Sequence, residues 1–326
     1  MVTRKFSTRI TKMLGCDHPI LCGGMQWLSR AEFVAEVCNA GGFGFITAET
    51  FDTSGDLREE IRKTRTLTDK PFGVNISMLP ELRVGERTLR FCDVVCEEGV
   101  KCVETSGRSP EPILPKLKEA GVKVIHKLTS VRHAETAQRV GVDAVTLIGF
   151  GSGGHIGLDN IASFILIPLS VSRLEIPVIA GGAVADGKGF VGALAMGAEA
   201  VLLGTRFLLT KECPIHPAIK EIIVQKKETE TTLIMSSIKN PLRCLRNRLA
   251  EEVQALEAKG ATLEEILLKV SGNKVKLAYS TGDPESPIPC GQAVGLINEI
   301  KSVRDVIDGI ISEGVELLSR LNRMAS

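Results

Sequence analysis

The sequence alternates short apolar runs with longer amphipathic segments between residues 19 and 205, and few folds accommodate such an order. We expect strands at the apolar runs, which are residues 19–22, 43–46, 72–76, 100–104, 122–126, 144–148, 177–180 and 200–203. These runs are continuously apolar rather than alternating, which is typical of parallel strands that are buried on both faces.

The amphipathic segments between the runs predict helices. They are residues 29–39, 56–64, 86–97, 112–120, 131–140, 161–174 and 187–196. Ser29 is expected to cap the first of them, and Pro168 to kink or end the sixth. Eight strand-then-helix units in this length of chain predict an α/β fold, a TIM (β/α)8 barrel. A doubly wound parallel sheet is the alternative.

The pattern changes beyond Cys213. Residues 221–272 are expected to be almost wholly helical, residues 279–290 to form a loop, and residues 293–321 to be helical again. We therefore expect three parts: a barrel over residues 1–215, a small helical subdomain or lid over 216–285, and C-terminal helices over 286–326 that pack back on the barrel.

The composition excludes several classes of function. Lys and Arg number 40 against 39 Asp and Glu, and there is one Trp and one Tyr, so neither nucleic acid nor an anionic membrane is an expected partner. The longest apolar runs, such as residues 164–169, are too short to span a bilayer.

The nine cysteines are scattered, odd in number and without a CxxC pair. Residues 1–14 carry too much charge for the apolar core of a secretory signal. We therefore expect a cytoplasmic protein with reduced thiols. Cys92 and Cys96 lie one helical turn apart, but typical zinc spacings are absent, so no metal site is predicted.

Loops that follow the strands of a barrel gather on one face and form its site. The residues that follow the predicted strands include Gly23, Gly24, Met25, Asn75, Lys127, the segment 149–157, Gly181, Gly182, Gly204 and Thr205. Paired glycines after the seventh and eighth strands, with a Thr hydroxyl, predict a phosphate site. Tight turns would also explain these glycines.

His155 is the candidate acid or base, because its small and glycine neighbours offer no apolar face for a structural histidine. The other four histidines are interpreted as structural. Lys127 could contact a cofactor or substrate, or lie on the surface. Gly149, Gly151 and Gly154 have the spacing of a dinucleotide fingerprint, but they follow the sixth strand and no helix opens directly after them.

No G-x-S-x-G, Walker A or H-E-x-x-H motif is present. A phosphate site beside so few nucleophiles suggests that a bound phosphorylated cofactor supplies the reactivity. The alternative outside the enzymes is a barrel that binds a phosphate ligand without such a cofactor.

Five segments resemble the nitronate monooxygenase (2-nitropropane dioxygenase) family, whose members are FMN-binding TIM barrels with a small helical domain. They are residues 23–25, 71–75, 152–157, 179–182 and 204–207. Residues 24–27, 126–134 and 210–217 are most similar to bacterial NADH:quinone reductases of that family. Residues 152–157 and 291–292 are equally similar to flavin-dependent enoyl-ACP reductases.

The resemblance implies non-covalent FMN, with NAD(P)H as co-substrate. Gly23, Gly24 and Met25 would line the flavin ring, and Asn75 and Lys127 would bind it. The phosphate and ribityl chain would be held by Ala180, Gly181, Gly182, Gly204 and Thr205, with Gly153 and Gly154 also near the cofactor. His155 would act as acid or base, or orient the substrate. Relatives usually carry acids where this chain has Ile148 and Gly151.

Reduction of a quinone is the favoured activity, with oxidation of alkyl nitronates by O2 and reduction of an enoyl thioester as alternatives. All three would use the same site, so the fold alone does not choose among them. A homodimer is left open.

Overall fold

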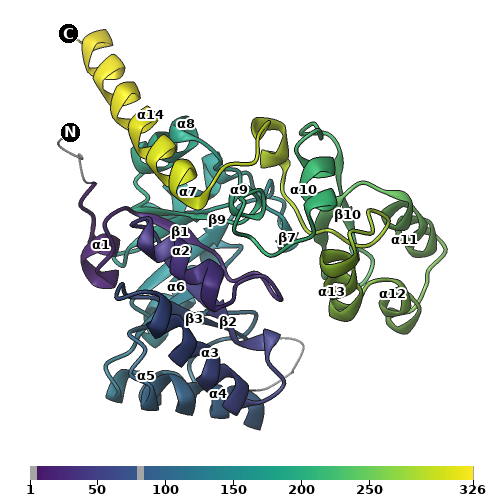
Figure 1. Ribbon diagram of the computed structural model, residues 1–326, viewed down its shortest axis with the longest axis horizontal. Coiled ribbons are helices and arrows are strands. Elements are labelled where there is room, and N and C mark those ends of the chain that lie inside the picture. The colour runs from purple at the N-terminus through teal and green to yellow at the C-terminus, as the bar shows by residue number, and fades with distance from the viewer. Residues whose placement is uncertain (1–5, 79–83, 326) are drawn as a thin grey trace.

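Eight parallel strands close into a barrel in the computed structural model, which describes residues 6–78 and 84–325 (Figure 1). The barrel strands are β1 (Ile20–Cys22), β2 (Phe43–Thr47), β3 (Gly73–Ser77), β4 (Cys102–Ser106), β5 (Lys123–Leu128), β6 (Ala144–Ile148), β8 (Val178–Gly181) and β9 (Ala200–Leu203). Their order around the barrel is β1-β2-β3-β4-β5-β6-β8-β9, and Leu21 of β1 pairs with Leu202 of β9. This closure confirms the TIM barrel and excludes the doubly wound sheet.

Helices surround the strands on the outside of the barrel (Figure 1). They are α2 (Ala31–Asn39), α3 (Ser54–Leu67), α4 (Glu86–Glu97), α5 (Leu114–Glu119), α6 (Val131–Val140), α7 (Ser163–Val171), α8 (Gly187–Ala195) and the short α9 (Thr205–Leu208). A 3-10 turn, η1 (Ala48–Thr50), follows β2, and α1 (Arg9–Leu14) precedes β1.

Two local expectations about these helices are wrong. The residue that caps α2 is Arg30, without a side-chain hydrogen bond, whereas the Ser29 hydroxyl accepts from the Met25 N–H at 2.9 Å. Ser29 therefore braces the turn after β1. Helix α7 continues past Pro168 to Val171.

Two buried clusters divide the core. Apolar residues inside the barrel, among them Leu21, Phe43, Phe45 and Ile125, pack on Ile10 and Leu14 of α1. A larger cluster fills the space between the strands and the surrounding helices. Because neighbouring residues of a strand face opposite sides, the residue two places beyond an inward-facing one also faces the barrel interior.

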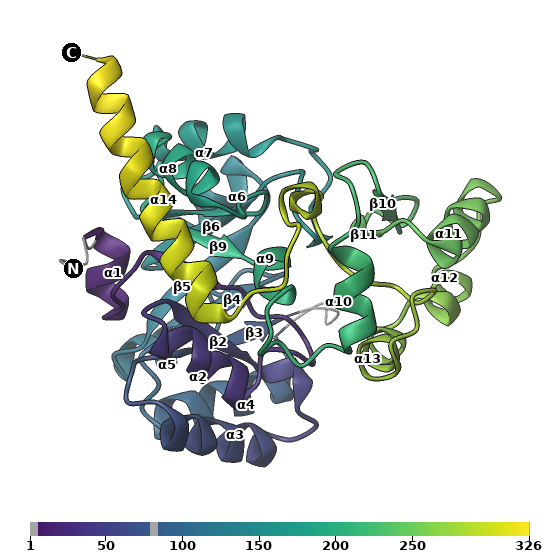
Figure 2. The same cartoon turned by 45° about the horizontal axis from the view of Figure 1, so that its top comes forward.

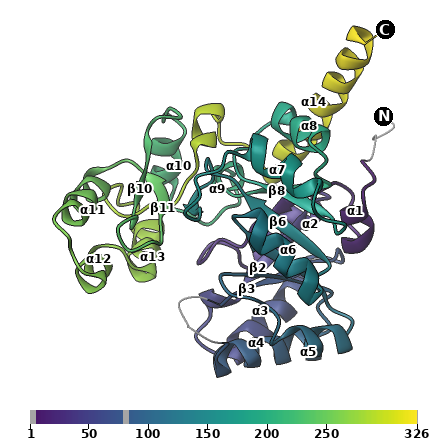
Figure 3. The same cartoon turned by 180° about the vertical axis from the view of Figure 1, so that it is seen from behind.

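The segment after the barrel differs from expectation, because residues 231–245 are not helical. They form β10 (Thr231–Ile234) and β11 (Leu242–Leu245), which make a three-stranded antiparallel sheet with β7 (Gly154–His155). The helices of this part are α10 (Pro217–Ile223), α11 (Arg248–Ala258), α12 (Leu263–Lys269) and α13 (Gly272–Thr281). Figures 1 and 3 show this subdomain to one side of the barrel, and Figure 1 shows β7 between the two.

The chain then returns to the barrel through η2 (Gln292–Leu296) and ends in the long helix α14 (Val303–Met324). Helix α14 lies along α8, where the Glu313 carboxylate accepts from the Gly187 N–H at 2.7 Å (Figure 2). The division at residues 215 and 285 stays a proposal, and its outermost residues, 1–5 and 326, lie outside the described part of the chain. Among the described residues, we find no helix that could cross a membrane.

Candidate active site

Glycines that follow β1, β8 and β9 meet at the carboxyl end of the barrel. Gly23 and Gly24 come directly after β1, Gly181 ends β8 and precedes Gly182, and Gly204 follows β9. These positions agree with the loops in which the sequence placed a cofactor. The side chain of Ala180 instead belongs to the cluster outside the strands, so only its backbone could contribute to such a site.

Most of these glycines are required by their protein neighbours. A Cβ on Gly24 would lie 2.5 Å from the Asn75 Cβ, and one on Gly181 would lie 2.3 Å from the Ile148 Cδ1. Gly182 has a φ of 79°, and a Cβ there would meet the Ser152 Oγ at 1.6 Å. Close packing alone therefore explains these three glycines, as the alternative interpretation of the sequence allowed.

Gly204 is different, because a Cβ on it would meet no atom within 4 Å. It precedes Thr205, whose Oγ1 accepts a hydrogen bond of 2.9 Å from the Gly291 N–H. Protein packing does not explain a glycine at position 204, and its backbone faces open space. Gly204 thus leaves room beside its backbone at the carboxyl end of the barrel.

A buried polar chain connects three neighbouring strands. The Glu104 side chain is fully buried, and its Oε2 accepts from the Asn75 Nδ2 at 2.6 Å and from the Lys127 Nζ at 2.8 Å. Asn75 and Lys127 were predicted to follow strands but lie within β3 and β5. The structure brings these two predicted residues together through Glu104, which the sequence analysis missed.

Three oxygens on β4 and on the nearby strands β2 and β6 are buried without a hydrogen-bond partner. They are the Thr47 Oγ1, the Glu104 Oε1 and the Thr146 Oγ1, on β2, β4 and β6. Each residue stands two places beyond a member of the inner apolar cluster, so all three face the barrel interior. Buried polar atoms rarely remain unpaired. The carboxyl end of the barrel is therefore suited to a polar ligand that supplies their partners.

A second carboxylate lies close to this group. Burial raises the pKa of Glu49, in the turn after β2, to about 7, against smaller lowering effects that include the charge of Lys127. The Glu49 Oε2 is also buried without a partner. Glu49 therefore exchanges its proton near neutral pH.

His155 lies on β7, at the junction of the barrel and the subdomain. It pairs with Leu242 of β11, and its side chain is exposed. Surrounding protein nevertheless desolvates the imidazole, which lowers its pKa, while hydrogen bonds with the backbone of Asn240 and Pro241 oppose that shift. The imidazole is therefore mostly neutral at pH 7, so it can donate a hydrogen bond or accept a proton.

The loop that carries His155 is held by contacts from β11. A Cβ on Gly153 would lie 2.6 Å from the Cys290 carbonyl carbon, and Gly154 has a φ of 77° and pairs with Arg243. The Arg243 Nε donates to the Phe150 carbonyl at 3.2 Å. Gly153 and Gly154 therefore have structural reasons to be glycine, and their partner strand β11 was not predicted.

The other polar residues that were considered as ligands or catalysts either have hydrogen-bond partners in the protein or are not grouped with further metal-binding side chains. The His126 Nδ1 lies 2.8 Å from the Thr105 Oγ1, and the His216 Nδ1 accepts from the Ala218 N–H. All nine cysteines are free thiols. Within residues 6–78 and 84–325, no three His, Cys, Asp or Glu residues are grouped to hold a metal ion.

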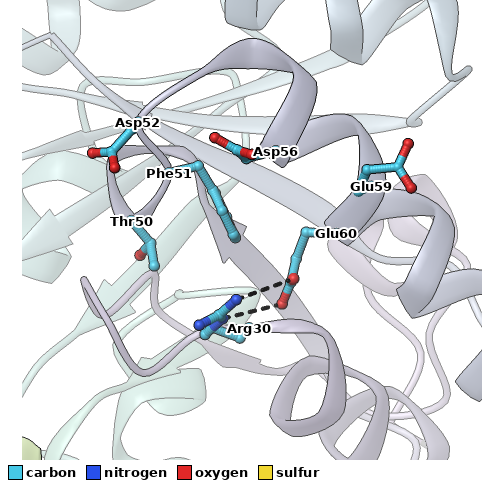
Figure 4. Close-up of a pocket in the computed structure, with 7 residues that line it drawn as sticks. All are labelled: Arg30, Thr50, Phe51, Asp52, Asp56, Glu59 and Glu60. Carbon is cyan, nitrogen blue, oxygen red and sulfur yellow. Dashed lines mark hydrogen bonds and ion pairs between the residues drawn. The ribbon is translucent and has the colours of Figure 1, made fainter.

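A cavity of about 400 Å³ lies beside the turn after β2 and is lined by other residues (Figure 4). It is lined by Arg30, Thr50, Phe51, Asp52, Asp56, Glu59 and Glu60. Arg30 pairs with Glu60 and lies over the Phe51 ring. This cavity shares no lining residue with the group at the carboxyl end of the barrel, so we do not assign the chemistry to it.

Comparison with known proteins decides the family. Residues 7–313 match the family model described as nitronate monooxygenase. The chain belongs to the nitronate monooxygenase family. The resemblance seen in the sequence is thereby confirmed, and members of this family and its relatives are named as oxidoreductases, so the protein is an enzyme.

Relatives within and around the nitronate monooxygenase family differ in their named activities. A Rhodococcus jostii (3aS,4S,5R,7aS)-5-hydroxy-7a-methyl-1-oxo-octahydro-1H-indene-4-carboxyl-CoA dehydrogenase is 30% identical, with 97% of this chain and 98% of the relative covered. A probable nitronate monooxygenase from Staphylococcus aureus is 31% identical, over 76% of this chain and 81% of its own. Thermotoga maritima FabK has 36% identity and a TM-score of 0.91, with 98% and 99% of the two chains covered.

Proposed function

We propose that the protein is an FMN-dependent oxidoreductase that exchanges electrons between NAD(P)H and an acyl thioester. The set of unpartnered buried oxygens at the carboxyl end of the barrel, beside Lys127, carries this proposal. A flavin ring offers both hydrogen-bond donors and acceptors, so it fits the Thr47, Glu104 and Thr146 oxygens.

The residues that would hold the cofactor follow from the geometry. The open backbone at Gly204, with Thr205 beginning α9, would take the phosphate. Gly23, Gly24 and Met25 would face the ring, with Asn75 and Lys127 at its edge. When bound, a flavin accepts and returns electrons as hydride at its N5. Lys127 supplies positive charge where that exchange creates negative charge.

The acyl thioester replaces the quinone as the favoured substrate for two reasons. The Rhodococcus relative, which matches nearly the whole chain, is named for a CoA thioester. Residues 152–157, which hold His155, are similar to those of flavin-dependent enoyl-ACP reductases. A quinone is the second candidate, supported by the similarity of residues 24–27 and 126–134 to NADH:quinone reductases. An alkyl nitronate remains the third, because family members are named for it.

His155 would manage the proton of a thioester reaction. Reduction of an α,β double bond needs one proton at the α-carbon, and the reverse reaction needs a base there. Because its pKa is lowered, His155 in its neutral form could act as the base or donate a hydrogen bond. A bound anion would raise that pKa again. Its place on β7 puts it beside the barrel mouth and leaves its side chain open to substrate.

An anaerobic half-reaction experiment tests the proposal. The purified protein should be yellow and lose its visible absorbance with NADH or NADPH, and crotonyl-CoA should restore it faster than menadione does. Faster recovery with menadione would favour the quinone reductase. Loss of the visible absorbance with propyl nitronate in place of NAD(P)H, followed by recovery when O2 is admitted, would favour the nitronate monooxygenase. A colourless protein that neither retains nor takes up added FMN would contradict the proposal and leave the flavin-free barrel.

A further inference from the structure

We propose that Glu104 is a flavin-site residue, which holds Asn75 and Lys127 in place and sets the flavin's reduction potential by balancing the charge of Lys127. This inference rests on the proposed function, because it requires a flavin in the barrel. It assigns a role to a carboxylate that the sequence analysis did not select.

The position of Glu104 singles it out. It occupies the third place of β4, and Asn75 is its register partner on β3. Its Oε2 receives hydrogen bonds from Asn75 and from Lys127, on the strands to either side. One oxygen thus fixes two side chains that the family resemblance places at the flavin. Rotation of Glu104 would release both.

If Glu104 had a purely structural role, both of its carboxylate oxygens should have hydrogen-bond partners, but one of them does not. Its side chain has 0% exposure, yet its Oε1 has no hydrogen-bond partner. Leaving a buried charged acceptor unpaired is costly. A donor on a ligand removes that cost, and the oxidised flavin ring carries such a donor at N3, as do the ribityl hydroxyls. The unpaired oxygen is therefore an observation independent of the bridge to Lys127.

The opposite charges of Glu104 and Lys127 predict the direction in which each would shift the flavin's reduction potential. Lys127 alone would stabilise the negative charge that a reduced flavin acquires, and so would raise the reduction potential. Glu104, at 2.8 Å from the Lys127 Nζ, offsets that positive charge. Removing the carboxylate should therefore raise the potential, whereas removing the lysine should lower it. A carboxylate that only held the two strands together would not shift the potential in this direction.

The test compares Glu104→Gln with Lys127→Met and with the double variant. Gln keeps the size of Glu and still accepts hydrogen bonds from Asn75 and Lys127. At a fixed ambient potential, Glu104→Gln should raise the ratio of reduced to oxidised flavin at least tenfold, which is about 30 mV for a two-electron couple. Lys127→Met should lower the ratio by a similar factor. In the Lys127→Met protein, Glu104→Gln should change the ratio by less than tenfold, because the positive charge that Glu104 offsets is already absent.

The chain contains a matched control, an ion pair at the opposite end of β5 from Lys127. Asp143 pairs with Lys123 at 2.9 Å, at the start of β5. Four residues of a strand place that pair about 13 Å from Lys127. Asp143→Asn makes the same chemical change as Glu104→Gln and should leave the ratio within twofold of the unchanged protein.

Spectroelectrochemical titration of the flavin-loaded proteins decides the question without an activity assay. An unchanged or lowered ratio in Glu104→Gln, with flavin fully bound, overturns the inference. If that variant does not retain flavin, Glu104→Asp decides the question. It keeps the charge, so the ratio of reduced to oxidised flavin should stay within twofold of the unchanged protein. A tenfold shift overturns the inference. If even the unchanged protein binds no flavin, the proposed function fails instead.

Discussion

Arg243 of β11 lies across the ring of Phe150, with its guanidinium carbon 4.6 Å from the ring centroid. Arg243 is buried and forms no ion pair with a carboxylate of the described residues. It donates hydrogen bonds to the Phe150 carbonyl and to the Thr231 Oγ1. Burial lowers its pKa. This arginine connects the hairpin of the subdomain to the loop that carries His155.

We expect Arg243→Met to loosen that loop while the flavin stays bound, because Arg243 contacts none of the residues at Gly204 or Lys127. Reduction by NAD(P)H should be retained, and the second half-reaction should slow about tenfold to a hundredfold through misplacement of His155. Stopped-flow measurement of the two half-reactions tests this. Arg246→Met, at an exposed arginine of the same segment, is the control. Equal rates in both variants would mean that Arg243 does not position His155.

Gly204 offers a cleaner test of the phosphate site than Gly182 does. Any side chain at position 182 is opposed by Ser152 and by the positive φ, whether or not a phosphate binds. Gly204→Ala should retain FMN, whereas Gly204→Asp should weaken binding at least tenfold, because its carboxylate repels the phosphate. Equilibrium dialysis measures both. Gly192, another glycine with no atom in reach of a Cβ, provides the control pair, and FMN affinity unaffected by Gly204→Asp would refute the phosphate assignment.

His155→Ala should leave both flavin binding and reduction by NAD(P)H largely unchanged, since hydride transfer needs positioning rather than a proton donor. Reoxidation by an enoyl thioester should slow by roughly two to four orders of magnitude, with a smaller effect for a quinone. Because the pKa of His155 is lowered, the wild-type rate should stay constant as the pH falls through the usual histidine range. It should change only at lower pH. Rapid mixing across pH tests this against His133→Ala, an exposed histidine. Identical reoxidation rates with every acceptor would remove His155 from the reaction.

Glu49→Gln should make stability less dependent on pH. Burial raises the pKa of Glu49 from its ordinary value of 4.5 to about 7, so the folded state favours the protonated carboxyl. That contribution is fully present below pH 4.5 and is lost as pH rises through 7. Above pH 8, the variant should be more stable than the unchanged protein by about 2 kcal/mol, with little difference at pH 4.5. Thermal unfolding at both pH values checks this, with Glu59→Gln as the exposed control.

The barrel could be predicted because its strands carry their own signal. Residues 144–148 and 200–203 are apolar runs between glycines or charged residues, and the structure gives both strands the predicted bounds. A strand buried on both faces is apolar at most of its positions, so neighbouring elements are not needed to recognise it. The glycines at the site were also visible, although their packing partners were not.

The hairpin of the subdomain was missed although part of its signal was present. Thr231 and Thr232 are β-branched, and Pro241 should have argued against a helix through residues 221–272. Strand β7 has two residues and forms by pairing with β11, so no local pattern could reveal it.

Glu104 could have been found from the sequence. It stands within the apolar strand that begins at Val100 and is followed by Thr105. A carboxylate in a strand buried on both faces must have a partner or a function. Its contact with Lys127, 23 residues later, depends on the register between β4 and β5 and needed the structure.

The pairing of His155 with Leu242 has a consequence for how the enzyme is made. The last barrel strand ends at Leu203, but the strand that completes the His155 segment begins 39 residues later at Leu242. A chain emerging from the ribosome can therefore close its barrel while the histidine loop still lacks its partner. Catalytic competence would arise in a late step of synthesis, and a chain cut between residues 204 and 241 would yield a barrel that lacks this support for His155.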